Sequence, residues 1–142
     1  MVTAYNQRDV AGILAMLRHL GATVGQGPRA ARLADAYERR LATVAAKTGN
    51  ATGPRVYFEE WDDPMISGIQ WVSELVEIAG GRDVFPDLAR QGAATGRIVT
   101  ADQVIAAAPD IILASWCGKK VRPEKLAARP GWTTLPAVRH AR

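Results

Sequence analysis

The chain has 142 residues, of which 48% are hydrophobic, so it is long enough for one domain with a packed core. No run of about 18 apolar residues occurs, which excludes a membrane-spanning helix, and the first residues lack the basic-then-apolar pattern of a secretory signal. The net charge is +4, but the basic residues are scattered and not interleaved with aromatics, so no nucleic-acid partner is expected. The lone Cys117 excludes an internal disulfide.

The first third of the sequence predicts two helices. Apolar residues recur at helical spacing after Asp9, a suitable N-cap, and Gly21 stands where a left-handed C-terminal cap belongs. After a glycine-rich connector, Pro28 opens a longer amphipathic helix that is expected to run to about Lys47. At ~1.5 Å per residue this helix would be roughly 30 Å long, about the width of a small domain.

Three short segments in the rest of the chain predict strands. Residues 55–58 (RVYF) form a short apolar run, and residues 110–114 (DIILA) form a continuous one. Because both faces of such a strand are apolar, the second run predicts a central strand that is covered on both sides. Residues 135–138 (LPAV) are expected to begin a further strand.

Helices are predicted between these strands. Ser67 with Gln70, and Thr100 with Gln103, have the spacing of capping boxes at the start of a helix, and Pro123 opens a third, shorter helix. The order is therefore strand, helix, helix, strand, helix, strand. This alternation predicts an α/β fold with a mainly parallel sheet.

Two loops after the predicted strands carry candidate site residues, because ligands of open α/β sheets bind outside the carboxyl ends of the strands. A large aromatic side chain in a polar loop supplies rigid contact area for a flat ligand. Trp61 in the first loop and Trp116 in the second fit this role. Trp71, in a first helical turn, fits either the core or a site, whereas Trp132 is expected to pack the last short helix against the sheet.

Most enzymatic interpretations of these loops fail on residue type or spacing. Cys117 has no second cysteine for dithiol exchange, and residues 118–120 (GKK) lack the glycine and the Ser/Thr of a phosphate-binding loop. Neither histidine lies on these loops, so a Cys–His nucleophile pair is not expected. The four carboxylates among residues 59–63 fit either a solvated loop or an acid–base pair. An intracellular α/β enzyme that uses this acidic loop and Cys117 is therefore the alternative to a binding protein.

A series of short motifs follows in a fixed order along residues 55–142. They read Glu60-Trp61-Asp62-Asp63-Pro64, Gly68, Trp71, Glu74-Leu75, Ala79-Gly80-Gly81, Pro109-Asp110-Ile111-Ile112, Arg129-Pro130-Gly131-Trp132 and Leu135-Pro136-Ala137-Val138. In this order they resemble the carboxyl-terminal lobe of the periplasmic substrate-binding proteins of ABC importers for cobalamin and ferric siderophores, and the cobalamin branch most closely.

This resemblance implies a three-layer α/β lobe with a mainly parallel sheet, preceded by a long inter-lobe helix. Residues 1–27 would be a remnant of the amino-terminal lobe and a connector, with Val2–Tyr5 as its last strand. Residues 28–49 would be the connecting helix, and residues 50–142 the ligand-binding lobe, incomplete at its end. The chain is thus expected to be a one-lobe fragment, periplasmic in its full-length form.

The implied function is that of a solute-binding component for a corrinoid or ferric siderophore, which is not an enzyme and has no resident cofactor or metal. Tryptophans would supply flat apolar surface to the ligand, and polar side chains would contact its edge. The implied ligand-binding residues are Glu60, Trp61, Asp62, Gln70, Trp71, Trp116, Cys117 and Lys119. Branch members often carry histidine in the position of Gln70, so an axial or edge ligand to a metal centre is lost here.

Two further partners are implied. Glu59 is a candidate for the surface carboxylates with which these proteins dock on arginines of the membrane permease. Without a second lobe, apolar surface on the long helix and on residues 9–20 would be exposed, and such patches seldom stay uncovered. The chain is therefore expected to form a two-fold homodimer through these helices.

Overall fold

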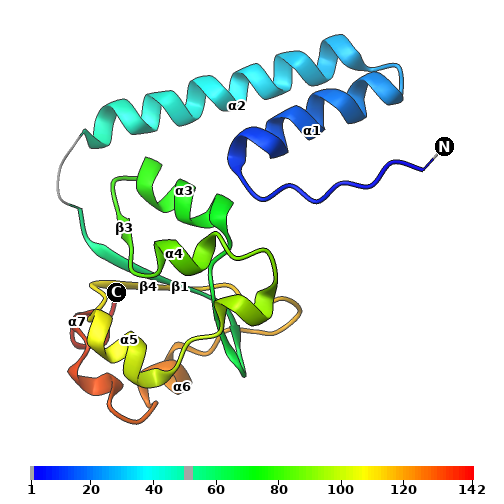
Figure 1. Ribbon diagram of the computed structural model, residues 1–142. Coiled ribbons are helices and arrows are strands. Elements are labelled where there is room, and N and C mark those ends of the chain that lie inside the picture. The colour runs from blue at the N-terminus through cyan, green and yellow to red at the C-terminus, as the bar shows by residue number, and fades with distance from the viewer. Residues whose placement is uncertain (1, 50–52) are drawn as a thin grey trace.

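The computed structural model describes residues 2–49 and 53–142, in which a pair of helices lies on one side of a small α/β unit (Figure 1). Helix α1 comprises Val10–Thr23 and helix α2 comprises Gly27–Thr48. Asp9 caps α1 as predicted, because its Oδ1 accepts a hydrogen bond of 2.6 Å from the Gly12 N–H. Pro28 lies in the first turn of α2, also as predicted. At ~1.5 Å per residue, α2 extends for about 33 Å.

The predicted end of α1 at Gly21 is wrong. The helix continues to Thr23, and the residue with positive φ is Gly25, at 71°. Gly21 is buried where the two helices approach each other, and a Cβ at this position would lie 2.1 Å from the Cβ of Ala30. The glycine thus serves the close contact between α1 and α2 instead of a cap.

Strand β1 is the central strand of a four-stranded sheet. It comprises Arg55–Asp62 and is hydrogen-bonded to all three other strands. It pairs in parallel with β3 (Arg82–Asp83) and β4 (Ile111–Ala114), and antiparallel with β2 (Met65–Ser67). Figure 1 shows α3 on one side of the sheet and α5, α6 and α7 on the other, so the α/β fold with a largely parallel sheet is confirmed.

The prediction that residues 110–114 form a central strand is wrong in its position. Among the described strands β4 pairs with β1 alone, and the Leu113 side chain is 45% exposed. The central strand is β1, which pairs with the three other strands and contains the buried residues Val56 and Tyr57. An unbroken apolar run marks a strand, but it does not state how many neighbours the strand has.

The capping box proposed at Ser67 and Gln70 is also wrong. Ser67 belongs to β2, and its hydroxyl donates to the carbonyl oxygen of Arg97 at 3.1 Å. Helix α3 (Gln70–Ile78) begins after Ile69 without a side-chain cap. Ser67 is therefore part of the β-hairpin that precedes α3 and does not cap the helix.

Of the remaining helical segments, α5 and α6 were predicted, whereas α4, η1, η2 and α7 were not. Thr100 and Gln103 form both hydrogen bonds of the predicted capping box at α5 (Ala101–Ala107). Residues 135–138 were predicted as a strand, but residues 136–138 belong to α7, because Pro136 takes the first helical position after the extended Leu135. The other segments are α4 (Pro86–Ala89), η1 (Ala94–Arg97), α6 (Pro123–Ala127), η2 (Trp132–Thr134) and α7 (Pro136–Arg139).

The core lies between β1 and the helices on the α5 side of the sheet. Its buried side chains are Tyr57, Val99, Val104, Leu126, Trp132 and Leu135. Trp132 is fully buried, as predicted, and the Tyr57 ring meets it edge-to-face at 6.2 Å. Residues 2–5, expected to match a strand, have no strand assignment. In the described part of the chain no helix is both long and apolar enough to cross a bilayer.

Candidate functional site

The acidic stretch of residues 59–63, predicted as a loop, forms most of a β-hairpin. Strand β1 continues to Asp62, the chain turns at Asp63 and Pro64 through a cis peptide bond, and β2 runs back beside it. The register shifts between Glu59 and Trp61, which marks a bulge. Because side chains of a strand alternate between its faces, the carboxylates are separated into different surroundings.

At the carboxyl end of β1 the two predicted loops meet. The Lys119 ammonium donates to Asp62 Oδ1 at 2.8 Å and lies 4.0 Å from the centre of the Trp61 ring. The Trp61 indole N–H in turn donates to the Asp63 carbonyl oxygen at 2.9 Å. The hydrogen bond from Lys119 lowers the pKa of the Asp62 carboxyl, so this carboxylate stays ionised at neutral pH. We call Trp61, Asp62 and Lys119 the edge cluster.

Behind this edge, Trp116 is connected to the core by a buried carboxylate. Its indole N–H donates to Glu59 Oε1 at 2.9 Å. Arg129 donates two hydrogen bonds of 2.5 and 2.9 Å to the same carboxylate, and the Tyr57 hydroxyl donates to it at 3.1 Å. Burial, and after it the Glu59 charge, raise the pKa of Tyr57, so its hydroxyl remains a donor. We call these four residues the Glu59 network.

The expectation that Glu59 is a surface carboxylate for docking on a permease is wrong. Its exposed fraction is 0%, because it lies on the central strand and points into the core. A buried carboxylate needs compensating donors. Those donors, above all Arg129, were not recognised in the sequence, although Arg129 opens one of the motifs quoted above.

Glu60, the next carboxylate, is paired with a different arginine. Arg97 donates to both of its oxygens, at 2.6 and 3.3 Å, and also to the Ser67 carbonyl oxygen at 2.7 Å. Arg97 is only 3% exposed, and its Nε has no hydrogen-bond partner among the described residues. Because residues 59 and 60 are neighbours in a strand, their side chains point to opposite faces, so each carboxylate needs its own cation.

Two of the predicted ligand residues lie elsewhere. The Gln70 side chain donates to Glu74 at 3.0 Å, and the other oxygen of Glu74 accepts from the Val10 N–H at 2.7 Å. Trp71 lines a hollow of about 320 Å³ between α3 and the helical pair. The contacts of Gln70 and Trp71 thus place them with the helices and not with the edge cluster, which differs from the expectation of one shared wall.

The remaining chemistry-bearing groups do not assemble. Cys117 is exposed beside Trp116, whereas His19 accepts a hydrogen bond of 2.8 Å from the Tyr5 hydroxyl when its Nδ1 is unprotonated. With the Glu59 and Glu60 carboxylates each bound to an arginine, residues 59–63 do not form an open acid–base pair. Within residues 2–49 and 53–142 no group of three or more His, Cys, Asp or Glu side chains is arranged to hold a metal ion.

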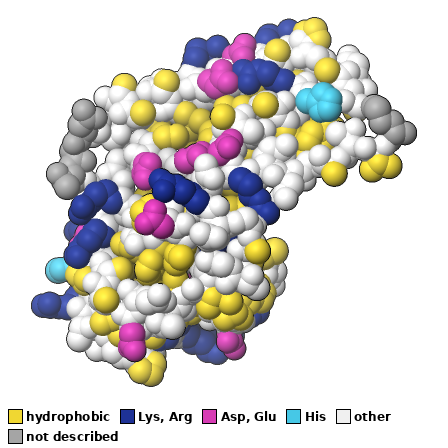
Figure 2. Space-filling view, viewed as in Figure 1, with side chains coloured by type: hydrophobic (Ala, Val, Ile, Leu, Met, Phe, Trp, Pro, Cys, Tyr) yellow, Lys and Arg dark blue, Asp and Glu magenta, His cyan; other side chains and the backbone are white. Residues whose placement is uncertain are grey.

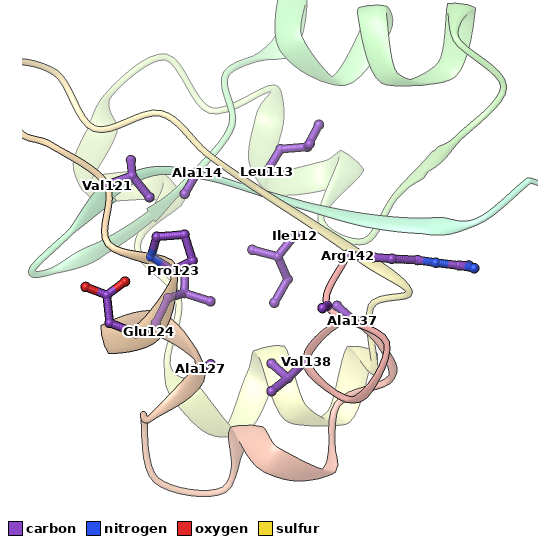
Figure 3. A pocket seen from close by; sticks show the side chains of 12 residues that line it. Ile112, Leu113, Ala114, Val121, Pro123, Glu124, Ala127, Ala137, Val138 and Arg142 are labelled. Atoms are coloured by element: carbon purple, nitrogen blue, oxygen red, sulfur yellow. The ribbon is translucent and has the colours of Figure 1, made fainter.

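A hollow of about 600 Å³ lies apart from both tryptophan groups. It is an open groove between β4, α6 and α7, and Figure 3 shows Ile112 and Val138 lining it from opposite sides. Its lining is mostly apolar, with the charged Glu124 and Arg142 also contributing. None of the predicted ligand residues lines this groove.

Comparisons with known proteins agree with this architecture. A family model described as "Periplasmic binding protein" matches residues 1–142. None of the curated proteins matches the chain. Solved structures do match, but this chain spans only about half the length of each of the three described next.

A possible iron-binding (periplasmic solute-binding) protein from Staphylococcus epidermidis is 16% identical, with a TM-score of 0.75 over 95% of this chain and 52% of that one. The periplasmic heme-binding protein RhuT from Roseiflexus is 23% identical, with a TM-score of 0.76 over 96% and 54%. The periplasmic vitamin B12 binding protein BtuF of Vibrio cholerae is 20% identical, with a TM-score of 0.64 over 99% and 53%. These likenesses show the fold, and with the family match over its whole length the chain belongs to the periplasmic binding protein family.

Proposed function

We propose that this chain contributes one wall of the ligand site in the solute-binding component of an ABC importer, and that the ligand is a corrinoid, a heme or a ferric siderophore. The observation that carries the proposal is the edge cluster, which brings two sequence-distant loops together at the carboxyl end of the sheet in a chain of this family. The similar proteins described above include ones named for iron, heme and vitamin B12, which supports this range of ligands.

The chemistry of the wall suits a flat, partly charged ligand. Indoles offer rigid apolar area with little loss of conformational entropy. Trp61 and Trp116 would contact the ring system, while Lys119 would meet anionic groups at its edge. The half-exposed Lys119 is held by Asp62 at 2.8 Å, so it can be exchanged between that carboxylate and a ligand at low cost. Cys117, exposed between these groups, would contact the ligand edge.

The rest of the machinery is proposed on the same basis. A second lobe would supply the opposite wall of the cleft, with α2 as the connection between lobes. The full-length protein would act outside the cytoplasmic membrane and deliver its ligand to a permease. Docking carboxylates must be accessible to a partner protein, so they have to be sought among exposed acids and not at the buried Glu59.

We also propose that the 142-residue chain self-associates through its helical pair. Large hydrophobic side chains are exposed on both helices, among them Leu20 and Val24 in and after α1, and Leu33 and Tyr37 on α2. Figure 2 shows hydrophobic side chains on the helical pair, including the side that faces the α/β unit. A two-fold dimer is the commonest way in which one chain covers such a surface.

The function is tested by titrating the chain with heme, cyanocobalamin and a ferric hydroxamate siderophore, followed by tryptophan fluorescence and by ligand absorbance. Because one wall covers only part of a ligand, we expect dissociation constants between about 10 µM and 1 mM. Trp61→Ala should abolish the signal of the ligand that binds. A Kd above about 1 mM for all three ligands would show that the proposed ligand class is wrong.

A further inference from the structure

We propose that Glu59, together with Arg129, is a positioning residue for Trp116: the buried ion pair fixes the orientation of this indole and thereby sets the affinity for a flat ligand. The effect on affinity rests on the function proposed above. The fixed orientation of the indole does not, and it can be measured in the absence of any ligand.

The backbone that carries Trp116 gives its side chain little support. Ser115 donates to the Glu59 carbonyl oxygen at 3.0 Å, which is the last backbone hydrogen bond to β1 before the loop begins. Residues 117–120 are exposed, and Gly118 has a φ of 73°, typical of a turn. A side chain on such a loop would ordinarily exchange between rotamers. Its orientation therefore depends on what the indole itself contacts.

The polar contact of that indole is a carboxylate with unusually complete hydrogen bonding. Glu59 Oε1 accepts from Trp116 and from Arg129 Nη2, and Oε2 accepts from Tyr57 and from Arg129 Nη1. Each oxygen thus has two donors, and the residue is fully buried. A buried polar network in which every member is satisfied is rigid, since any rotation would break a hydrogen bond that water cannot replace.

Arg129 connects this carboxylate to the core. Its guanidinium carbon lies 4.6 Å from the ring centre of the buried Trp132, so the cation is held against an aromatic face while it pairs with Glu59. A continuous line of contacts therefore runs from the core, through Trp132, Arg129 and Glu59, to Trp116 in its exposed loop. The neighbouring carboxylate, Glu60, pairs with Arg97 instead and serves as a matched control.

The first test needs no ligand. The four tryptophans give four indole N–H signals in a spectrum of ¹⁵N-tryptophan-labelled protein, and the signal lost in Trp116→Phe identifies Trp116. Glu59→Gln puts an amide NH2 in place of one carboxylate oxygen, so Arg129 loses one of its two acceptors in either orientation of the amide. Trp116 then either loses its acceptor or donates to a neutral carbonyl oxygen instead of a carboxylate. We expect the Trp116 signal to shift and to exchange faster with water, and Glu60→Gln to leave it in place. An unchanged Trp116 signal in Glu59→Gln would overturn the proposal.

The second test asks whether the effect on affinity passes through the indole. For the flat ligand that binds, Glu59→Gln should weaken binding about fivefold to tenfold. In a Trp116→Phe background the same substitution should change the Kd by less than about twofold, since the phenyl ring has no N–H to hold. An equal loss in both backgrounds would show that Glu59 supports the fold in general and would overturn the proposal.

Two further outcomes are separable. If Glu59→Gln does not fold, Arg129→Lys keeps the charge but loses the two-pronged grip on the carboxylate, and the same shift of the Trp116 signal is expected. If the wild-type chain binds no flat ligand, the proposed function and the effect on affinity both fail. The indole signal then decides by itself whether Glu59 positions Trp116.

Discussion

The Lys119 ammonium lies 4.0 Å from the centre of the Trp61 ring while it donates a hydrogen bond to Asp62. One face of this indole is therefore covered by a cation. A flat molecule that stacks on that face has to displace Lys119, and the displaced ammonium is then available to an anionic group on the ligand. The identity of residue 119 should consequently affect charged and uncharged ligands differently.

We expect Lys119→Met to weaken the binding of heme, which carries two carboxylates, by about twofold to fivefold, as is usual for one exposed ion pair. Cyanocobalamin, which has no free carboxylate, should bind within about twofold of the wild type. Fluorescence titration of both ligands at low salt measures the difference. Lys120→Met, at the adjacent exposed lysine, is the control, and an equal loss of affinity for both ligands would contradict the role of the charge.

Trp61 and Trp132 should respond in opposite ways to truncation. Trp132 is fully buried, so Trp132→Ala should lower the free energy of unfolding by ~3–5 kcal/mol. Trp61 lies on the outer hairpin, so Trp61→Ala should cost little stability but remove ligand binding. Urea unfolding followed by far-UV circular dichroism measures the first effect, and titration the second. Comparable destabilisation by the two substitutions would mean that Trp61 belongs to the core.

The contact between Arg55 and Asp110 should make the free energy of unfolding decrease at low pH. Hydrogen bonds from the Arg55 side chain and backbone hold the pKa of Asp110 at about 2, below its ordinary value. A lowered folded-state pKa means that the contribution is complete above the unfolded-state value of about 4. It is then lost as the pH falls from about 4 through about 2.

We therefore expect Asp110→Asn to lower the melting temperature at pH 7, and the difference from the wild type to shrink between pH 4 and pH 2. The control is Asp87→Asn, which removes the exposed carboxylate paired with Arg90 at 3.1 Å and should change little at any pH. A difference between Asp110→Asn and wild type that stays constant down to pH 2 would show that the carboxylate charge is not what stabilises the contact.

Self-association through the helical pair predicts a specific pattern of variants. Sedimentation equilibrium at micromolar concentration should give a dimer mass for the wild-type chain. Leu33→Glu, on the exposed side of α2, should give a monomer because it places a charge in the contact. Leu113→Glu is a matched control, since Leu113 has a similar exposed fraction of 45% but lies on β4. A monomeric wild type, or dissociation only by Leu113→Glu, would contradict the helical contact.

Local patterns in the sequence predicted the elements well where only neighbouring residues decide. The cap at Asp9 and the box at Thr100 depend on hydrogen bonds within one turn, and both are present. Gly21 was misassigned because its role depends on Ala30, which approaches from another helix. Ser67 was misassigned for a similar reason, since its hydroxyl bonds to Arg97 across the hairpin.

The candidate site shows the same division. The pairing of the Trp61 loop with the loop after β4 followed from the rule that parallel strands end at one edge, and Lys119 lies there beside Asp62. The burial of Glu59 could not be deduced from its acidic neighbours, because it depends on Arg129, seventy positions later in the chain. Acidic residues are uncommon in strands, so the sequence of residues 59–63 favours a loop. The arginines that pair with Glu59 and Glu60 in the strand become neighbours only in the folded chain.

Helix α3 is hydrogen-bonded to the first residue of α1 and to the last residue of α2. Its Glu74 accepts from the Val10 N–H at the start of α1, and its Ile78 carbonyl accepts from the Thr48 hydroxyl at the end of α2. Because α3 begins three residues after β2 ends, a displacement of the Trp61 hairpin would shift α3 and so alter these two hydrogen bonds. Occupancy of the edge cluster should then change the rate of amide hydrogen exchange in the last turn of α2, although no residue of the cluster belongs to that helix.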